Sequence, residues 1–173
     1  MNAADQARLK ELMLRAPALT LAVAESVTCG GIQQRVGRIS GASGFFLGGV
    51  TAYSAAQKAR HLGVAAPAAL TVNSVSLAIA GQMAAGACRM FGADVSLATT
   101  GYAEADEAWK VAEPFAFWAA AWRRSRASGG GPDIEVVAAG KIECAGYGRA
   151  QAQDRFAEEA LAALVAILAE ERA

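Results

Sequence analysis

Two periods of hydrophobic residues divide the chain into expected helices and strands. Apolar side chains recur every three to four positions in several segments, which predicts amphipathic helices. The expected helices cover residues 3–16, 30–38, 54–62, 76–91 and 149–171. Short apolar runs predict strands instead, at 19–24, 45–53, 95–100, 114–122 and 134–143. Because helices separate the early strands and a hairpin joins the last two, we expect one α/β domain with a mixed sheet over residues 1–173.

Proline, serine and glycine mark several boundaries of these elements. Pro17 is expected to end the first helix, and Ser76 is expected to cap the fourth. Gly48 and Gly49 lie inside a predicted strand, where they indicate a bulge or a close approach of another backbone. Residues 123–132 combine arginines with serines and glycines, so we expect them to form the solvated tip of the last hairpin.

Composition and charge narrow the class of protein. The chain has 173 residues, of which 54% are hydrophobic and 18% charged, as is typical of a globular protein. Sixteen basic residues balance sixteen acidic ones, so no net charge attracts nucleic acid or an anionic membrane. No uncharged apolar run is long enough for a transmembrane helix, and the N-terminus lacks the pattern of a signal peptide. We expect a cytoplasmic protein without nucleic-acid or membrane partners.

Cysteine and histidine usage argues against both a disulfide framework and a zinc site. Cys29, Cys88 and Cys144 form an odd, widely spaced set, which is typical of reduced thiols. The single histidine, His61, has no cysteine pair at ligand spacing near it. We therefore expect no metal, and we expect Cys29 to be a small packing residue.

The stretch AESVTCGG at residues 24–31 concentrates polar and reactive side chains after an apolar strand. A strand that enters a helix through glycines exposes backbone N–H groups, which favour an anion. A hydroxyl held there, such as that of Ser26, can act as a nucleophile, with neighbouring amides as an oxyanion hole. A capped turn without catalytic function explains the same pattern equally well. The residues alone leave both interpretations open.

Two further strand ends carry candidate side chains. Tyr53 ends the second strand, and Lys58 lies in the first turns of the next helix. A desolvated lysine can lose its proton and act as a base for a serine, although a surface lysine is the commoner case at such a position. Thr100 and Gly101 end the third strand. If the three strand ends lie at the same edge of the sheet, they form one crevice of the kind in which α/β proteins bind ligands.

Five segments, in this order, resemble the C-terminal domain of the competence/damage-inducible CinA family. They read AESVTCGG, FFLGGVTAYSAAQK, HLGV, VNSVSLAIAGQMAAG and ATTGYAE, and the match spans most of residues 9–165. Each motif is weak alone, but five in register are specific. The resemblance implies an αβα sandwich that self-associates, with a homodimer as the first choice. It also implies hydrolysis of the carboxamide of nicotinamide mononucleotide, giving ammonia and nicotinic acid mononucleotide.

The resemblance further implies roles for individual residues. By analogy with serine–lysine hydrolases, Ser26 would attack the amide carbon and Lys58 would take its proton. Backbone amides near residues 28–30 would hold the oxyanion, and Tyr53 is placed with the catalytic pair. No metal or organic cofactor is needed. The residues implied to bind the nucleotide substrate are Glu25, Thr28, Gly30, Thr100, Gly101 and Arg149.

Two departures from the family pattern affect the expected phosphate site. The third motif usually continues as a glycine-rich loop, whereas residues 102–107 here read YAEADE. The carboxylates of Glu104, Asp106 and Glu107 would repel a nearby phosphate. An arginine that the family often carries in the last helix is replaced by Gln153. We therefore expect weak binding of nicotinamide mononucleotide, and the alternative function is a nucleotide-binding module with altered or lost catalysis.

Overall fold

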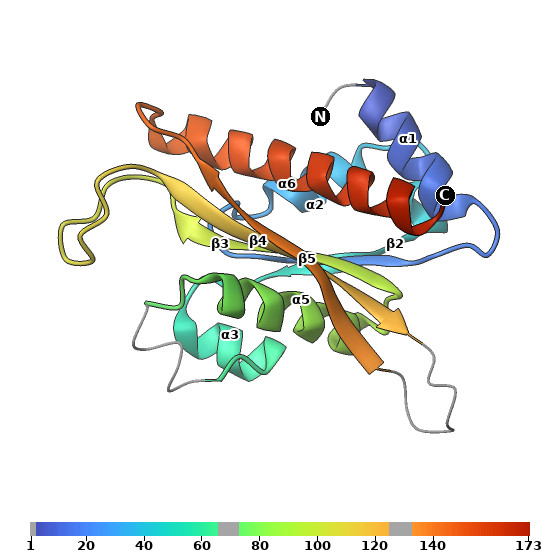
Figure 1. Cartoon of the computed structure of the whole chain (residues 1–173), viewed down its shortest axis with the longest axis horizontal. Coiled ribbons are helices and arrows are strands. Elements are labelled where there is room, and N and C mark those ends of the chain that lie inside the picture. Colours follow the sequence, from blue (N-terminus) through green and yellow to red (C-terminus); the bar gives the residue numbers. More distant parts are fainter. Residues whose placement is uncertain (1–2, 66–72, 125–132) are drawn as a thin grey trace.

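The computed structural model places one five-stranded sheet between two layers of helices (Figure 1). It describes residues 3–65, 73–124 and 133–173. The strands are β1 Leu21–Glu25, β2 Phe46–Thr51, β3 Val95–Tyr102, β4 Phe115–Arg124 and β5 Asp133–Glu143, in the spatial order β2-β1-β3-β4-β5. β1 pairs in parallel with both β2 and β3, whereas β4 and β5 add antiparallel strands. The sheet is therefore mixed, as the sequence predicts.

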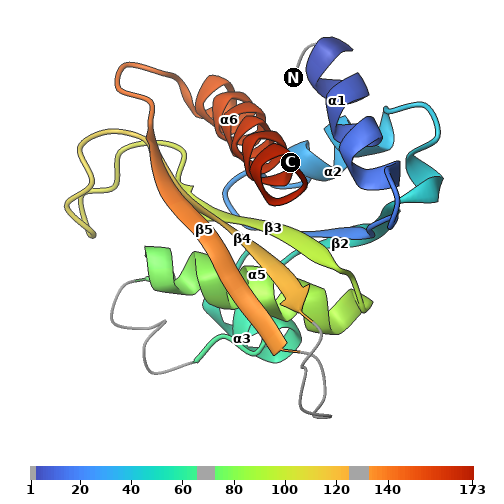
Figure 2. The same ribbon diagram turned by 45° about the vertical axis from the view of Figure 1, so that its right-hand side comes forward.

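Helices cover both faces of this sheet (Figure 1, Figure 2). One face carries α1 Ala3–Leu14, α2 Gly31–Gly37 and α6 Arg149–Glu171, and the other carries α3 Ala55–Leu62 and α5 Leu77–Phe91. A short 3-10 turn, Ala42–Gly44, leads into β2. This arrangement is the predicted αβα sandwich. None of the described helices is long and apolar enough to cross a bilayer.

The alternation of side chains along β3 supplies both hydrophobic cores. Successive side chains of a strand point to opposite faces of the sheet. Val95 and Leu97 are buried in the core that also contains residues of α6, whereas Ala98 is buried in the core that contains residues of α5. Ser96 also faces α5, because its hydroxyl donates to the carbonyl of Ala84 at 2.6 Å. Side chains of β3 are thus buried on both faces of the sheet. This packing fixes the strand against which β1 is aligned.

The carboxyl ends of β1, β2 and β3 lie together at one edge of the sheet. Glu25, the last residue of β1, pairs with Thr51 of β2 and with Thr99 of β3. Parallel strands present their carboxyl ends on the same side, where α/β proteins bind ligands. The condition stated for a single crevice is therefore met.

β2 contains the bulge that its two glycines predict. Leu21 pairs with Phe46 but Ala22 pairs with Gly48, so one residue of β2 is unpaired between them. Gly48 has a φ of 135°, a conformation that residues with side chains rarely adopt. A Cβ atom at Gly49 would lie 2.4 Å from a methyl carbon of Val23, so the close approach at this position requires glycine.

Several boundaries differ from the prediction by a few residues, and two of the differences have a clear structural reason. β3 continues to Tyr102 because β4 extends the antiparallel ladder, pairing Tyr102 with Phe115. Arg123 was expected in the solvated hairpin tip, but it lies in β4, and its guanidinium donates to the carbonyl of Cys88 at 2.7 Å. That contact ties β4 to the last turn of α5. Arg124 of the same predicted tip also lies in β4, and residues 125–132 lie outside the described residues.

Candidate functional site

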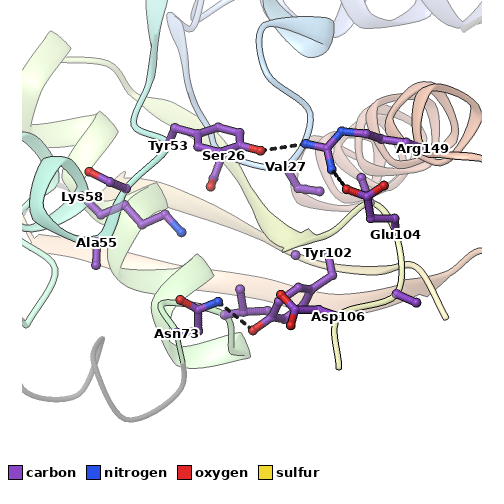
Figure 3. A pocket seen from close by; sticks show the side chains of 15 residues that line it. Ser26, Val27, Tyr53, Ala55, Lys58, Asn73, Tyr102, Glu104, Asp106 and Arg149 are labelled. Carbon is purple, nitrogen blue, oxygen red and sulfur yellow. Dashed lines mark hydrogen bonds and ion pairs between the residues drawn. The ribbon is translucent and has the colours of Figure 1, made fainter. Parts of the chain in front are cut away.

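The edge at which β1, β2 and β3 end borders a cavity of about 400 Å³. Its lining includes Ser26 from the end of β1, Tyr53 and Lys58 from the segment after β2, and Gly101 from β3. Arg149 reaches the cavity from the first residue of α6 (Figure 3). The structure therefore brings together five residues that the sequence placed at the site, from four segments that are distant along the chain.

Glu25 anchors the turn that carries the candidate nucleophile. Its Oε2 accepts hydrogen bonds from the hydroxyl of Thr28 at 2.6 Å and from the backbone N–H groups of Gly30 and Ile32 at 3.0 Å each. Its Oε1 accepts from the N–H of Gln33 at 2.9 Å. A carboxylate at a helix N-terminus satisfies amides that have no partner within the helix. We expected Glu25 to bind substrate; it is fully buried and caps α2 instead.

This cap also corrects the expected oxyanion hole. The amides near residues 28–30 were expected to hold the oxyanion, but the N–H of Gly30 donates to Glu25 and that of Cys29 donates to the carbonyl of Ser26 at 3.2 Å. Among the described residues, no acceptor is found for the amides of Val27 and Thr28, which directly follow Ser26. Any oxyanion donors in this turn are therefore the two amides next to the serine.

Ser26 presents a free hydroxyl to the cavity. Its backbone N–H donates to the carbonyl of Thr99 at 3.0 Å, which fixes the residue against β3. Ser26 is 6% exposed and lines the cavity. Within the described part of the chain, no group forms a hydrogen bond with its Oγ atom. The hydroxyl is therefore held in place by its backbone and remains available to a ligand.

Lys58 is buried rather than exposed on the surface of α3. The residue is 2% exposed, and its Nζ donates to the carbonyl of Ser74 at 3.0 Å and to Oγ1 of Thr100 at 2.9 Å. The hydroxyl of Thr100 in turn donates to the same carbonyl at 2.8 Å. No described carboxylate lies within ion-pair distance of Nζ. The commoner interpretation, a surface lysine, is therefore wrong for this position.

Burial changes the acidity of this lysine. Desolvation lowers the pKa of Lys58 from 10.5 to about 8, because the charged ammonium loses hydration and the described residues supply no counter-ion to replace it. A general base works best when its pKa lies near the operating pH. The amine of Lys58 is therefore partly unprotonated at neutral pH, and it lies on the wall of the cavity that Ser26 also lines.

Thr100 and Gly101 have different places at the site, because only Gly101 lines the cavity. Thr100 was expected to touch substrate, but it is fully buried and its hydroxyl is engaged with Lys58 and Ser74. Gly101 lines the cavity. A Cβ atom at Gly101 would lie 2.3 Å from the carbonyl oxygen of Phe115, so glycine is required here for β4 to pack against β3.

Thr28 and Gly30 line a second cavity, of about 650 Å³, next to the first. The hydroxyl of Thr28 is already engaged with Glu25 and with Oγ1 of Thr99 at 2.7 Å. Cys29 also lines the second cavity; it is exposed, with a left-handed φ of 49°, so it is not the packing residue that we expected.

Tyr53, Arg149 and Glu104 form a bridge that borders both cavities. Arg149 Nη2 donates to the hydroxyl of Tyr53 at 2.8 Å, and Nη1 forms an ion pair with Glu104 (Figure 3). Tyr53 and Arg149 line both cavities, whereas Glu104 lines the first. Both ends of the guanidinium are therefore occupied by groups of the chain itself.

Sequence reasoning missed Ser74, whose carbonyl holds both Lys58 and Thr100. Asn73 and Ser74 adopt left-handed φ values of 46° and 58°, which turn this carbonyl toward the buried amine. Asn73 supports the turn by donating to the hydroxyl of Tyr102 at 3.0 Å. The hydroxyl of Ser74 is buried without a hydrogen-bond partner among the described residues. Asn73 is the only local signal, since asparagine tolerates this conformation.

From the sequence, Gln153 was considered only as the replacement of an arginine that could bind phosphate. Its side-chain Nε2 donates to the carbonyl of Val27 at 2.9 Å, so it ties the turn after Ser26 to α6.

The acidic loop lies partly where we expected it: Glu104 and Asp106 line the first cavity, whereas Glu107 lines neither of the two. The described residues contain no cluster of three or more metal-ligating side chains.

Comparison with known proteins identifies the family to which this chain belongs. The model of the CinA C-terminal domain matches residues 4–168. A CinA-like protein of Citrifermentans bemidjiense is 43% identical over 95 residues, which cover 55% of this chain and 23% of that protein. A CinA-like protein of Chlorobium phaeovibrioides is 37% identical over 123 residues, which cover 71% of this chain and 28% of that protein. The matched region thus spans about a quarter of these relatives.

Solved structures show the same fold over nearly the whole chain. The competence-damaged protein (CinA) superfamily protein from Enterobacter cloacae superposes with a TM-score of 0.79 at 25% identity, covering 95% of this chain and 90% of that one. The competence damage-inducible protein A from Klebsiella pneumoniae gives a TM-score of 0.78 at 26% identity, with 96% of each chain covered. The family match and the fold agree, and the chain belongs to the CinA C-terminal domain family.

Proposed function

We propose that this protein hydrolyses a small carboxamide, with Ser26 as nucleophile and Lys58 as general base. Nicotinamide mononucleotide is the substrate that the family resemblance implies. The single observation that carries the proposal is the pairing of a free serine hydroxyl with a buried lysine of lowered pKa on one cavity wall. Burial of an amine for which the described residues offer no counter-ion costs stability, so its presence in the same cavity as a free hydroxyl favours a chemical role.

The hydrogen bonds of Lys58 orient it as a base. A neutral amine has two N–H bonds and one lone pair, and both N–H bonds of Lys58 have acceptors, the carbonyl of Ser74 and Oγ1 of Thr100. The lone pair therefore points in a remaining tetrahedral direction. Because Lys58 and Ser26 both line the cavity (Figure 3), we propose that the lone pair serves the hydroxyl of Ser26.

The reaction then proceeds in two halves. Ser26 Oγ attacks the amide carbon while its proton passes to Lys58, and the amides of Val27 and Thr28 stabilise the developing oxyanion. Lys58 gives the proton to the departing nitrogen, which leaves as ammonia and an acyl-serine remains. Lys58 next takes a proton from water, which attacks the acyl-serine and releases the carboxylic acid and the free hydroxyl. One amide and one water thus yield one carboxylic acid and one ammonia.

A second candidate function is a binding module that keeps the cavity without catalysis. Lys58 Nζ donates to Ser74 and Thr100, and among the described residues no hydrogen bond joins it to Ser26 Oγ. This observation favours the binding module. Catalytic hydrogen bonds, however, often tighten only when substrate is bound. The two functions differ in whether a bound amide is consumed.

The test is ammonia release from nicotinamide mononucleotide by the purified protein. We expect turnover that falls by about a thousandfold or more in Ser26→Ala, as for other lost nucleophiles. Ser43→Ala, at an exposed serine that lines neither cavity, should keep wild-type activity. Turnover that survives Ser26→Ala would overturn the mechanism. Binding to wild-type protein without ammonia release would support the binding module instead.

A further inference from the structure

The positive features around the two cavities are already neutralised by carboxylates of the chain. Glu25 fills the N-terminus of α2, as described above. Arg35, which lines the second cavity, forms an ion pair with Asp154 at 2.8 Å. Arg149, which lines both cavities, forms an ion pair with Glu104. A phosphate that entered either cavity would have to displace an internal carboxylate to reach a guanidinium.

The remaining charge on the first cavity is also unfavourable to an anion. Its ionisable wall groups other than tyrosine are Lys58, Glu104, Asp106 and Arg149. When Lys58 is unprotonated, as a base must be, these groups carry one net negative charge. The first turn of α6 adds about half a positive charge, which does not cancel the two carboxylates together with a phosphate dianion. An uncharged or cationic ligand meets no such repulsion.

We propose that the site selects carboxamides that carry no phosphate or other anionic group, and that Glu104 is the specificity-determining residue. This inference rests on the amide hydrolysis proposed above. Glu104 acts in two ways: it occupies the guanidinium of Arg149, and it places its own charge on the cavity wall. The other end of the same guanidinium is held by Tyr53, so Arg149 cannot turn to a ligand without breaking a second contact.

Substrate charge also affects the base. A phosphate near Lys58 stabilises its ammonium form and lowers the neutral fraction available for catalysis, whereas a cationic pyridinium ring has the opposite effect. Solvent limits both effects, because the side chains of Arg149 and Glu104 are 46% and 62% exposed. Exposed ion pairs of this kind contribute modestly. We therefore expect discrimination of about two- to fivefold for each charge removed or restored.

Two probes that differ only in the phosphate test the proposal. Nicotinamide riboside and nicotinamide mononucleotide share the carboxamide, the pyridinium ring and the ribose. We expect wild-type kcat/KM for ammonia release to be higher for the riboside. In Glu104→Gln this preference should fall about two- to fivefold, mainly because the mononucleotide improves, and the change should shrink in about 1 M salt. Glu107→Gln removes the same charge from the same loop outside both cavities, and it should leave the preference unchanged.

The binding step separates failure of this inference from failure of the proposed function. Ser26→Ala protein can be titrated with both probes by calorimetry, whether or not the wild type releases ammonia. Absence of turnover in wild type contradicts amide hydrolysis, and tighter binding of the riboside to Ser26→Ala would still support selection by charge. Preference for the mononucleotide, a preference that Glu104→Gln leaves unchanged, or failure of both probes to bind would overturn the proposal.

Discussion

Lys58 Nζ lies 2.9 Å from Oγ1 of Thr100, and the direction of this hydrogen bond is fixed by a third group. The hydroxyl of Thr100 donates its proton to the carbonyl of Ser74 at 2.8 Å, so its oxygen is left to accept from Lys58. The amine, the hydroxyl and the carbonyl therefore form a closed set of three hydrogen bonds. Such a set orders the base in the absence of any ligand, and each member can be tested.

The rate of amide hydrolysis should rise with pH, reach half of its maximum near pH 8 and level off about one pH unit higher. Only the unprotonated amine can accept the proton of Ser26, and burial lowers the pKa of Lys58 to about 8. The pH dependence of kcat/KM between about pH 6 and 9 measures this group in the free enzyme. Lys58→Met should lose activity across the whole range. A profile that is flat around pH 8 would show that another group is the base.

The same lysine should make the fold more stable at alkaline pH. Its pKa is 10.5 when unfolded and about 8 when folded, so the unfolded chain binds more protons between these values. The free energy of unfolding therefore rises with pH through that window, by roughly 3 kcal/mol for the full drop. Urea unfolding of wild type and Lys58→Met at about pH 8 and 10 should show the rise in wild type alone. Equal slopes in both proteins would contradict a depressed pKa.

Thr100→Val should impair catalysis more than its effect on stability explains. The change removes the acceptor that orients Lys58, and we expect kcat to fall about ten- to a hundredfold. The apparent pKa in the pH–rate profile should also move down, because the ammonium form loses an acceptor. Ser96→Ala is the matched control, since it removes a buried hydroxyl in the same strand that bonds to Ala84 and not to the site. Thr100→Ser should restore most of the rate.

Gln153→Ala should lower kcat with little change in KM. Gln153 holds the carbonyl of Val27, and Val27 carries one of the two amides that we assign to the oxyanion. Loss of this contact is expected to reduce kcat about tenfold, as a loosened supporting contact does. Gln34→Ala, which removes a glutamine from the wall of the second cavity, is the control and should have near-normal kinetics. An increase in KM alone would instead indicate that Gln153 binds substrate directly.

Two glycines of α5 should respond to alanine in opposite ways. A Cβ atom at Gly86 would lie 2.3 Å from the carbonyl oxygen of Leu62, so Gly86→Ala should destabilise the fold by more than about 3 kcal/mol. A Cβ atom at Gly81 would lie 3.4 Å from a methyl carbon of Val136, an ordinary contact. Gly81→Ala should therefore stabilise the helix by about 0.5–1 kcal/mol. Urea unfolding of both variants measures the difference, and equal effects would contradict the packing of α5 against α3.

The parts of the fold and site that the sequence predicts are those with a local pattern. The apolar runs gave all five strands, and the parallel order of β1, β2 and β3 follows from the helices between them. No local pattern predicts that Lys58 is buried, because a helix can turn a lysine toward solvent or toward the sheet. Its orientation depends on how α3 packs in the fold. The acceptor for its amine, the carbonyl of Ser74, lies 16 residues away in a left-handed turn.

The role of Glu25 also depends on contacts that a local sequence pattern does not specify. The sequence places a carboxylate beside a serine, and the family resemblance implied that it binds substrate, whereas it caps α2. Its partners are amides five to eight residues ahead, and their position depends on how the chain turns through Cys29 and Gly30, both with positive φ. Side-chain identity alone does not specify that turn. The neutralisation of Arg149 by Glu104 could not be predicted from the sequence either, because this ion pair joins α6 to a loop 45 residues earlier.

The cap that Glu25 provides makes the turn that carries Ser26, the proposed nucleophile, part of the cooperatively folded sheet and helix α2. Four donors of the turn and α2 converge on one buried carboxylate, which itself belongs to the central part of the sheet. The turn cannot open alone, because any opening would leave this carboxylate buried without partners. Amides at Gly30, Ile32 and Gln33 should therefore exchange hydrogen with solvent only through global unfolding, and thermal loss of activity should coincide with loss of the sheet.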